Sequence, residues 1–188
     1  MQKRHRIFIA INLPGDVRKR LAGYGKKWTE LPAKWTALDN LHITLLFLGD
    51  VTDEEIGDIC LTAKAVASRH GALDVVLNKI SYGPDDKIPP RFIWASGEKN
   101  EELSALKKDL QDSLEGKVNL LPDFKIFTPH VTMARISTFQ WRTINPEERP
   151  EVNESIDLAF TVESIDVMES ELKREGPEYT IIESAQLQ

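Results

Sequence analysis

The sequence predicts an α+β protein with two pseudo-symmetric lobes, in which antiparallel sheets line a central cleft and helices lie outside. Two observations support this prediction. Each half of the chain runs strand, helix, strand. Each half also contains one strand with the pattern His-x-Thr, beginning at His42 and at His130. We therefore expect residues 1–188 to form a single two-lobed domain, with one motif in each lobe and a cleft along the seam.

The chain is expected to begin with a central strand over residues 5–13, in which Ile7, Ile9 and Ile11 alternate with Phe8 and Ala10. The first residues are basic and then apolar, as in a signal peptide. Pro14 follows after only a short apolar run, however, and no small-residue cleavage pattern is present. We expect Pro14 to open a helix whose apolar stripe is formed by Val17, Leu21, Tyr24 and Trp28.

A second strand and a second helix are expected to follow a loop. The strand covers residues 41–49 and contains the first motif. Thr52 and Glu55 then form a capping-box pattern at the start of the helix. The apolar stripe of this helix is formed by Ile56, Ile59, Cys60, Ala63 and Val66. Gly71 is expected to end it.

The middle of the chain repeats this order. Residues 73–80 and 91–96 have the composition of strands and are separated by a stretch rich in turn residues. An amphipathic helix follows, and its inward residues are Leu103, Leu106, Leu110 and Leu114. Gly116 is expected to end this helix, and residues 117–127 are interpreted as a connection.

The last part of the chain is expected to complete the sheet. Residues 128–136 form the strand with the second motif. Residues 139–154 show no periodicity and predict a long exposed loop, of a length that is often functional. Residues 156–169 and 178–184 predict further strands, with a turn around Gly176.

Composition and charge limit the possible functions. The chain has 188 residues, of which 41% are hydrophobic and 29% charged, and it contains no apolar run of the roughly 20 residues that a membrane helix needs. The only cysteine, Cys60, excludes an internal disulfide and is typical of a reducing compartment, so we expect a cytoplasmic protein. The net charge of −6 argues against a protein that wraps long nucleic acid, although a few local cations could bind an RNA end.

The two His-x-Thr strands carry the functional prediction. Side chains alternate across a strand, so His42 and Thr44 share one face, and His130 and Thr132 share another. The intervening apolar residues can then anchor each strand in a core. Because imidazole titrates near pH 6.5, two histidines can supply both a base for water and an acid for a leaving oxygen. Threonine hydroxyls can donate hydrogen bonds to phosphate oxygens.

Two other interpretations of these residues stay open. A single His-x-Thr on a strand is usually structural, and only the pair favours catalysis. Neutral imidazoles are also common metal ligands, but a zinc site generally needs three or four ligands at recognisable spacing. The sequence has no His-x-x-x-His, no His-Glu-x-x-His and no pair of cysteines. His5 and His70 lack a threonine two positions later, and we assign them no role.

At these residues the sequence resembles the two-histidine (2H) phosphoesterases, in particular the RNA 2′,3′-cyclic phosphodiesterases that were once called 2′-5′ RNA ligases. The resemblance covers nearly the whole chain. It rests on four segments, which are RIFIAINLPGDVRKRL, KWTALDNLHITLLFLGDV, PPRFIWAS and FTPHVTMARI. It implies a bilobal fold, no cofactor or metal, and hydrolysis of an RNA-terminal 2′,3′-cyclic phosphate to a 2′-phosphate. It also implies that His42 is the proton donor to O3′, that His130 is the proton acceptor from water, and that Thr44 and Thr132 assist them.

The resemblance further implies three substrate-binding residues. Arg135 would hold phosphate, and Trp35 and Phe8 would line the nucleoside pocket. Strict alternation places Arg135 on the face of the strand away from His130, so its role requires a bulge or a strand end after Thr132. Phe8 could equally be a core residue, and Trp35 could be a packed tryptophan.

The expected partner is an RNA 3′ end or a small cyclic nucleotide, bound by a monomer without a membrane. One alternative is a phosphodiesterase for another cyclic phosphate or for a 2′-5′ linkage, because the motifs recognise phosphate and ribose more than the base. Another alternative is a non-catalytic module that binds RNA ends. Turnover of a nucleoside 2′,3′-cyclic phosphate in excess chelator would separate these hypotheses.

Overall fold

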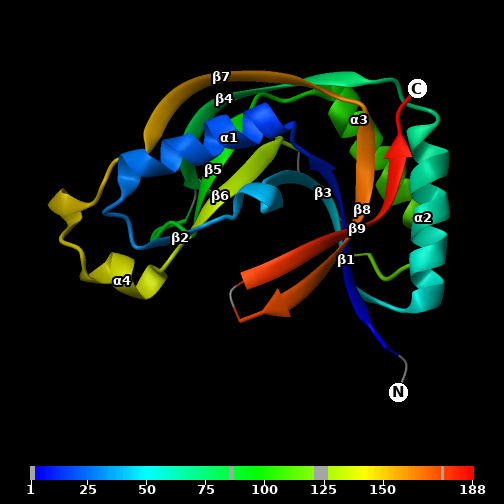
Figure 1. The fold of residues 1–188 in the computed structure, drawn as a ribbon, viewed down its shortest axis with the longest axis horizontal. Helices are drawn as coiled ribbons and strands as arrows, with labels where there is room; N and C mark the ends of the chain where they lie inside the picture. The colour runs from blue at the N-terminus through cyan, green and yellow to red at the C-terminus, as the bar shows by residue number, and fades with distance from the viewer. Residues whose placement is uncertain (1–2, 85–86, 121–126, 175) are drawn as a thin grey trace.

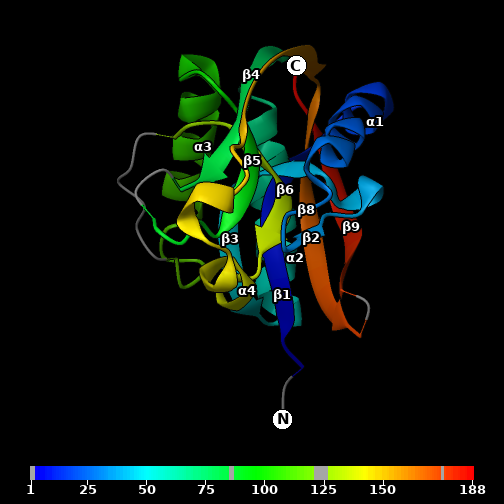
Figure 2. The same ribbon diagram turned by 90° about the vertical axis from the view of Figure 1, so that its left-hand side faces the viewer.

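The computed structural model describes residues 3–84, 87–120, 127–174 and 176–188. These residues form one curled antiparallel sheet, with helices packed around it (Figure 1). Its strands are not in sequence order. The arrangement confirms the predicted α+β class. Figure 2 shows the strands running between α3 (Glu101–Leu114) on one side and α1 (Gly15–Tyr24) on the other.

Within the described residues, nine strands make up the sheet. Eight of them lie in the order β7-β4-β5-β6-β3-β1-β8-β9, and β2 pairs with β6 beside this path. Their bounds are β1 His5–Asn12, β2 Ala33–Trp35, β3 His42–Val51, β4 Leu73–Gly83, β5 Phe92–Gly97, β6 His130–Ile136, β7 Asn153–Val162, β8 Ser164–Lys173 and β9 Gly176–Gln186. The strands predicted from alternation are present, with β4 longer than expected. The predicted run over 156–169 is divided between β7 and β8, and β2 lies where the sequence predicted a loop.

The strand order has an internal two-fold pattern. One half of the sheet begins with the first motif strand and reads β3-β1-β8-β9, and the other begins with the second motif strand and reads β6-β5-β4-β7. The two halves join where β3 pairs with β6, through Ile43 and Val131. Both side chains are fully buried. The two His-x-Thr strands are consequently neighbours at the centre of the sheet.

The helices follow the predicted apolar stripes. The capping box at the start of α2 (Asp53–Ala67) is confirmed, because Thr52 Oγ1 accepts from the Glu55 backbone N–H and a Glu55 carboxylate oxygen accepts from the Thr52 N–H. Helix α3 buries its predicted leucines and ends before Gly116, which has φ +77°. The prediction that Gly71 ends α2 is wrong by several residues, since the helix stops at Ala67. No helix in the described part of the chain is long and apolar enough to cross a membrane.

Residues 139–154 are not the continuous loop that the sequence predicted. They include most of a short helix, α4 (Thr138–Thr143), and a 3-10 turn, η3 (Pro146–Glu148). The Ser137 hydroxyl caps α4, and Trp141 is buried against the Tyr82 ring at a centroid distance of 5.2 Å. Such a helix is too short to show a 3.6-residue period, which explains the error. Of the predicted connection over 117–127, residues 121–126 lie outside the described part of the chain.

Thr52→Ala tests the capping box. The variant leaves the Glu55 backbone N–H at the start of α2 without its partner, so we expect the free energy of unfolding to fall by about 0.5–2 kcal/mol. Urea denaturation followed by circular dichroism would measure this change. Thr29→Ala, in a turn that contains no such cap, is the control, and equal stabilities of the two variants would contradict the assignment.

Candidate active site

The two motif strands repeat the same pattern of burial. From the histidine onward, each strand alternates between half-buried and buried residues up to the position after the threonine. Each then has two consecutive buried residues, Leu45 and Leu46 in β3 and Met133 and Ala134 in β6. The residue that follows is exposed in both strands. Alternation therefore breaks at equivalent positions in the two halves of the sheet.

A β-bulge causes this break in each strand. Against β1, Thr44 pairs with Ala10 and Leu46 pairs with Ile9, so Leu45 has no partner. Against β5, the same register shift leaves Met133 without a partner. Because an extra residue reverses the subsequent alternation, the bulges turn Phe47 and Arg135 to the face that carries the histidines. The bulge that a phosphate role for Arg135 required is thus present, and strict alternation gave the wrong face.

The pairing of β3 with β6 brings the motifs together. Ile43 and Val131 are direct partners in an antiparallel pair. The residues on either side of this pair therefore lie opposite each other, with His42 beside Thr132 and His130 beside Thr44. We call this side of the sheet the histidine face. On it, the two imidazoles and the two hydroxyls are related by the same internal two-fold pattern as the strands.

Each imidazole is held in the same way by the backbone. His42 Nδ1 lies 2.7 Å from the Asn40 carbonyl oxygen, and His130 Nδ1 lies 2.9 Å from the Thr128 carbonyl oxygen. A carbonyl can only accept, so Nδ1 carries the proton in both rings and Nε2 is the atom available for proton transfer. His42 Nε2 is 3.0 Å from Thr44 Oγ1. This geometry fixes both the tautomer and the orientation of each ring.

Burial favours the neutral form of both histidines. It lowers the pKa of His42 below its ordinary value, an effect that the Asn40 carbonyl opposes and that His130 increases. It also lowers the pKa of His130, where the Thr128 carbonyl opposes the shift and Lys107 adds to it. The electrostatic interaction between the two rings agrees with their placement on adjacent strands. Both rings are consequently poised as proton acceptors in the free protein.

Aromatic rings support His42. Phe8 lies 5.1 Å from the His42 ring centroid, and Tyr179 of β9 meets the same ring edge-on at 5.3 Å. Phe8 is only 4% exposed and belongs to a small cluster with Ala10, Met168 and Tyr179. It therefore packs against the His42 ring, and its expected place in a nucleoside pocket stays a prediction. Phe47 is the exposed ring on this side, at 75% exposure and 6.3 Å from Phe8.

A tryptophan supports His130. The Trp94 ring centroid lies 4.2 Å from that of His130. Trp94 lies over Gly83 of β4, where a Cβ atom would come within 2.3 Å of the indole. A glycine is therefore required for the indole to take this place beside the histidine. Sequence reasoning missed Trp94, Tyr179 and Phe47, because their positions depend on pairings between distant strands and on the bulges.

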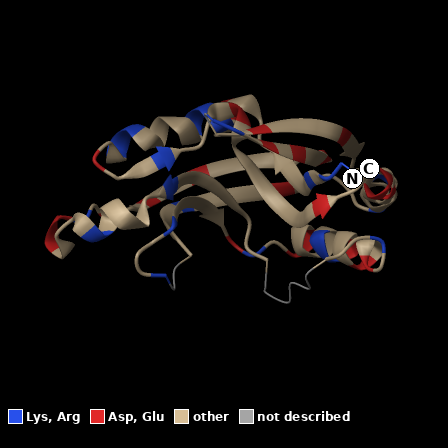
Figure 3. Cartoon of the chain, turned by 90° about the horizontal axis from the view of Figure 1, so that it is seen from below, with Lys and Arg blue, Asp and Glu red and all other residues tan. Residues whose placement is uncertain are grey.

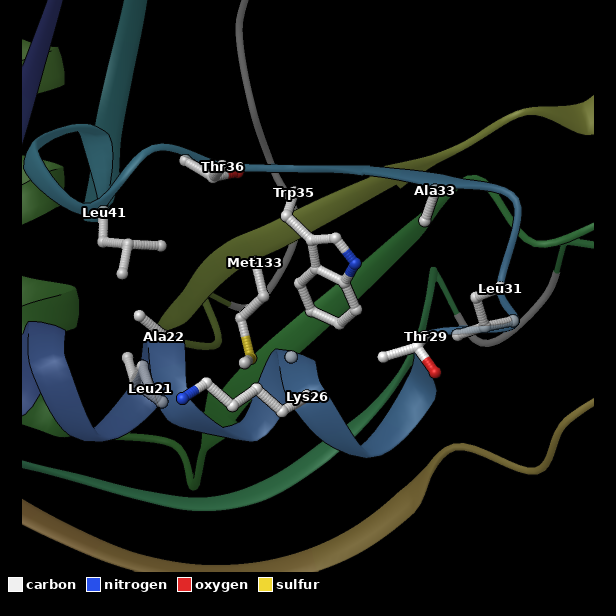
Figure 4. A pocket seen from close by; sticks show the side chains of 11 residues that line it. Leu21, Ala22, Lys26, Thr29, Leu31, Ala33, Trp35, Thr36, Leu41 and Met133 are labelled. Atoms are coloured by element: carbon white, nitrogen blue, oxygen red, sulfur yellow. The ribbon is translucent and has the colours of Figure 1, made fainter.

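The other two predicted binding residues take different places. The Arg135 guanidinium lies 5.3 Å from the Phe92 ring centroid, and so it is on the histidine face but beyond the ring that contacts His130. Trp35 pairs with Ala134, one of the buried bulge residues, and lines a cavity of about 380 Å³ with Met133 (Figure 4). That cavity lies on the opposite face of β6. The structure therefore does not bring Trp35 to the histidines, and its expected role in a nucleoside pocket stays a prediction.

The remaining histidines lie elsewhere in ion pairs. His5 contacts Glu169 at 2.5 Å and Asp53 at 3.0 Å, and His70 contacts Asp109 at 3.0 Å. The Arg69 guanidinium beside Asp109 lowers the pKa of that carboxyl to about 2. Among the residues that the structure describes, no three or more His, Cys, Asp or Glu side chains are grouped so that they could hold a metal ion.

Comparisons of sequence agree with this site. A family model described as LigT like Phosphoesterase matches residues 11–94. The RNA 2′,3′-cyclic phosphodiesterase of Thermus thermophilus is 30% identical over 192 residues, which cover 97% of this chain and 90% of the relative. The protein of that name from Aquifex aeolicus is 29% identical over 157 residues, which cover 82% of this chain and 81% of the relative. The Geobacillus stearothermophilus relative is 28% identical over 87% of this chain, which spans only 50% of that relative.

Solved structures share the fold. The crystal structure of TT0787 of Thermus thermophilus superposes with a TM-score of 0.82 at 29% identity, and the match covers 97% of both chains. Escherichia coli LigT complexed with 3′-AMP gives a TM-score of 0.76 at 22% identity over 98% and 99% of the chains, which shows a common fold. Fold and relatives together define the class of protein as a phosphoesterase. The chain belongs to the LigT-like phosphoesterase family.

The burial of the two histidines predicts how they titrate. We expect both imidazoles to have pKa values below the usual 6.5 or so, as measured by NMR of their ring protons. In the pH range between these values and 6.5 the unfolded chain binds more protons than the folded one. The free energy of unfolding should therefore decrease as the pH falls below about 6.5.

A double variant, His42→Gln with His130→Gln, should lose part of this dependence on pH, because it removes the two groups that change protonation. The wild-type protein measured under the same conditions is the reference. Imidazole pKa values at or above 6.5 in the native protein would contradict the assigned burial.

Proposed function

We propose that this protein hydrolyses the terminal 2′,3′-cyclic phosphate of RNA to a 2′-phosphate without a metal ion. The observation that carries the proposal is the meeting of the two motif strands, which places two backbone-oriented imidazoles and two threonine hydroxyls together on one face. The names of the Thermus and Aquifex relatives support the same reaction. The proposal treats residues 1–188 as one domain that works as a monomer in the cytoplasm.

The reaction needs two proton transfers. His130 Nε2 accepts a proton from water while the water oxygen bonds to phosphorus. The bond from phosphorus to O3′ breaks, and His42 donates a proton to the departing O3′. The products are a 2′-phosphomonoester and a free 3′-hydroxyl. Two imidazoles on opposite sides of one phosphate supply both transfers, so the chemistry requires no metal-bound water.

The shifted pKa values fit these roles when the substrate is included. Burial lowers the pKa of His130 and so favours its neutral form, which a base requires. His42 must be protonated to act as an acid, and its burial opposes this. The negative charge of the cyclic phosphodiester favours the imidazolium, so we expect substrate binding to raise the pKa of His42. The substrate thus helps to generate the acid that protonates its own leaving group.

The neighbouring side chains stabilise charge. We assign Thr44 and Thr132 to donate hydrogen bonds to the non-bridging oxygens, where negative charge increases in the transition state. Arg135 is assigned to a substrate phosphate, because its guanidinium lies on the histidine face. Phe8 and Trp94 position the two imidazoles from below and from the side, through the ring contacts described above.

Substitution of the four motif residues tests these roles. His42→Ala and His130→Ala should each lower kcat by about 10²–10⁴-fold, because each removes one proton transfer. Thr44→Val and Thr132→Val should lower kcat by a smaller factor, because each removes one hydrogen bond and no proton transfer. Initial rates with cytidine 2′,3′-cyclic phosphate would measure these effects, with thermal unfolding to verify the fold. His5→Ala is the control outside the site, and near-normal kcat in either motif-histidine variant would refute the mechanism.

Chelation tests the absence of a metal. Activity towards the same substrate should be unchanged after dialysis against excess EDTA, because the proposed acid and base are both side chains. Dialysis alone provides the matched control. Loss of activity that zinc, manganese or magnesium restores would replace the proposal with a metal-dependent one, and binding without turnover would favour the RNA-end-binding alternative.

A further inference from the structure

A row of aromatic rings leads away from His130 along β5. Trp94 contacts the His130 ring. Phe92 lies two residues before Trp94 in β5, on the same face of the strand and farther from His130. The Phe92 and Trp94 rings are stacked, with centroids 6.0 Å apart and planes only 9° from parallel. Phe92 is half-buried, so part of its ring faces solvent. The motif chemistry gives Phe92 itself no role.

Two arginines flank the Phe92 ring. The guanidinium carbons of Arg135 and Arg91 lie 5.3 Å and 5.8 Å from its centroid. Within the described residues, neither guanidinium forms an ion pair with a carboxylate. A protein with a net charge of −6 has many carboxylates with which to neutralise them. In single-stranded nucleic-acid sites, an aromatic ring stacks against a base and nearby cations contact the phosphates. Phe92 and its two arginines have this combination of groups.

Arg135 also lines a surface hollow, so its side chain connects the hollow with the Phe92 ring. The hollow has a volume of about 450 Å³ and is lined in part by Lys34, Arg135, Ser137 and Gln140. Lys34 and Arg135 are direct partners in the pairing of β2 with β6, so their side chains leave the same face. Figure 3 shows that basic segments gather at the end of the molecule that carries α1 and α4. The hollow therefore offers two cations and two polar side chains next to Phe92.

We propose that Phe92, Arg91, Arg135 and Lys34 form a subsite for the second nucleotide of an RNA 3′ end, the one on the 5′ side of the terminal cyclic phosphate. The inference rests on the proposed function. The base of this nucleotide stacks on Phe92, and the phosphate that links it to the terminal ribose lies between Arg135 and Lys34 in the hollow. The row His130, Trp94, Phe92 sets the direction, since it leads from the reacting phosphate towards this subsite.

The charge of the protein limits the subsite to a short segment. Many phosphate contacts would require a long basic surface, and the net charge of −6 does not provide one. Stacking on an aromatic ring tolerates any base because every base has a π face. The enzyme is therefore selective for an oligonucleotide end over a mononucleotide, without a strong preference for sequence.

The test compares two substrates in the same enzyme. One is uridine 2′,3′-cyclic phosphate, and the other is the dinucleotide ApU that ends in a 2′,3′-cyclic phosphate. We expect kcat/KM for the dinucleotide to exceed that for the mononucleotide by about 5- to 150-fold, the range of one base stack. The advantage should decrease as salt increases, because part of it comes from the linking phosphate.

Phe92→Leu should reduce this ratio to a few-fold, since leucine keeps an apolar side chain but offers no ring for stacking. Arg91→Gln, at an exposed position, should reduce the ratio by a smaller factor and remains informative if Phe92→Leu does not fold. Phe139→Leu is the matched control, because that ring is also exposed but lies on α4 and does not line the hollow. It should leave the ratio unchanged.

Equal kcat/KM for the two substrates would overturn the subsite while leaving the phosphodiesterase proposal intact. A ratio that Phe92→Leu and Arg91→Gln both leave unchanged would also overturn it. Failure to turn over either substrate would instead refute the proposed function. The two proposals can therefore fail separately.

Discussion

The pairing of Ile43 with Val131 is the constraint on which the candidate site depends. Both side chains are fully buried, so the two motif strands are fixed to each other by the core rather than by the polar groups that they present. This junction lies at the centre of the two-fold strand order, and it sets the histidines on one face as a pair. A polar replacement at either position would separate the imidazoles without altering them chemically.

The two bulges lie at equivalent positions of the two halves, but the side chains that they turn to the histidine face differ. Each reverses the alternation after the threonine and turns the next exposed residue to the histidine face. In one half that residue is Phe47 and in the other it is Arg135, so equivalent backbone positions present an apolar ring and a cation. The aromatic cluster around His42 and the arginine-flanked ring beyond His130 follow the same division. A symmetric scaffold thus supports an asymmetric surface, as a substrate with chemically different ends requires.

Much of this structure could be predicted from the sequence, because its main features are local. Alternation of Ile7, Ile9 and Ile11, the leucine stripe of α3 and the capping box of α2 each depend on residues a few positions apart. The shared face of each His-x-Thr pair is equally local. Long-range packing could not be predicted in this way. Strand pairing places Trp35 behind β6 and buries Phe8 against the His42 ring, and their expected roles in a nucleoside pocket stay predictions.

The central claim is that two imidazoles act on one phosphate from opposite sides, with O3′ as the leaving group. Hydrolysis of a nucleoside 2′,3′-cyclic phosphate in ¹⁸O-labelled water, followed by ³¹P NMR, tests it most directly. The arrangement predicts a single product, the 2′-phosphate, with one ¹⁸O atom bound to phosphorus, because water attacks opposite the bond that His42 protonates. A 3′-phosphate, or a mixture of the two isomers, would contradict the claim, since it would mean that the site does not distinguish the two ester oxygens.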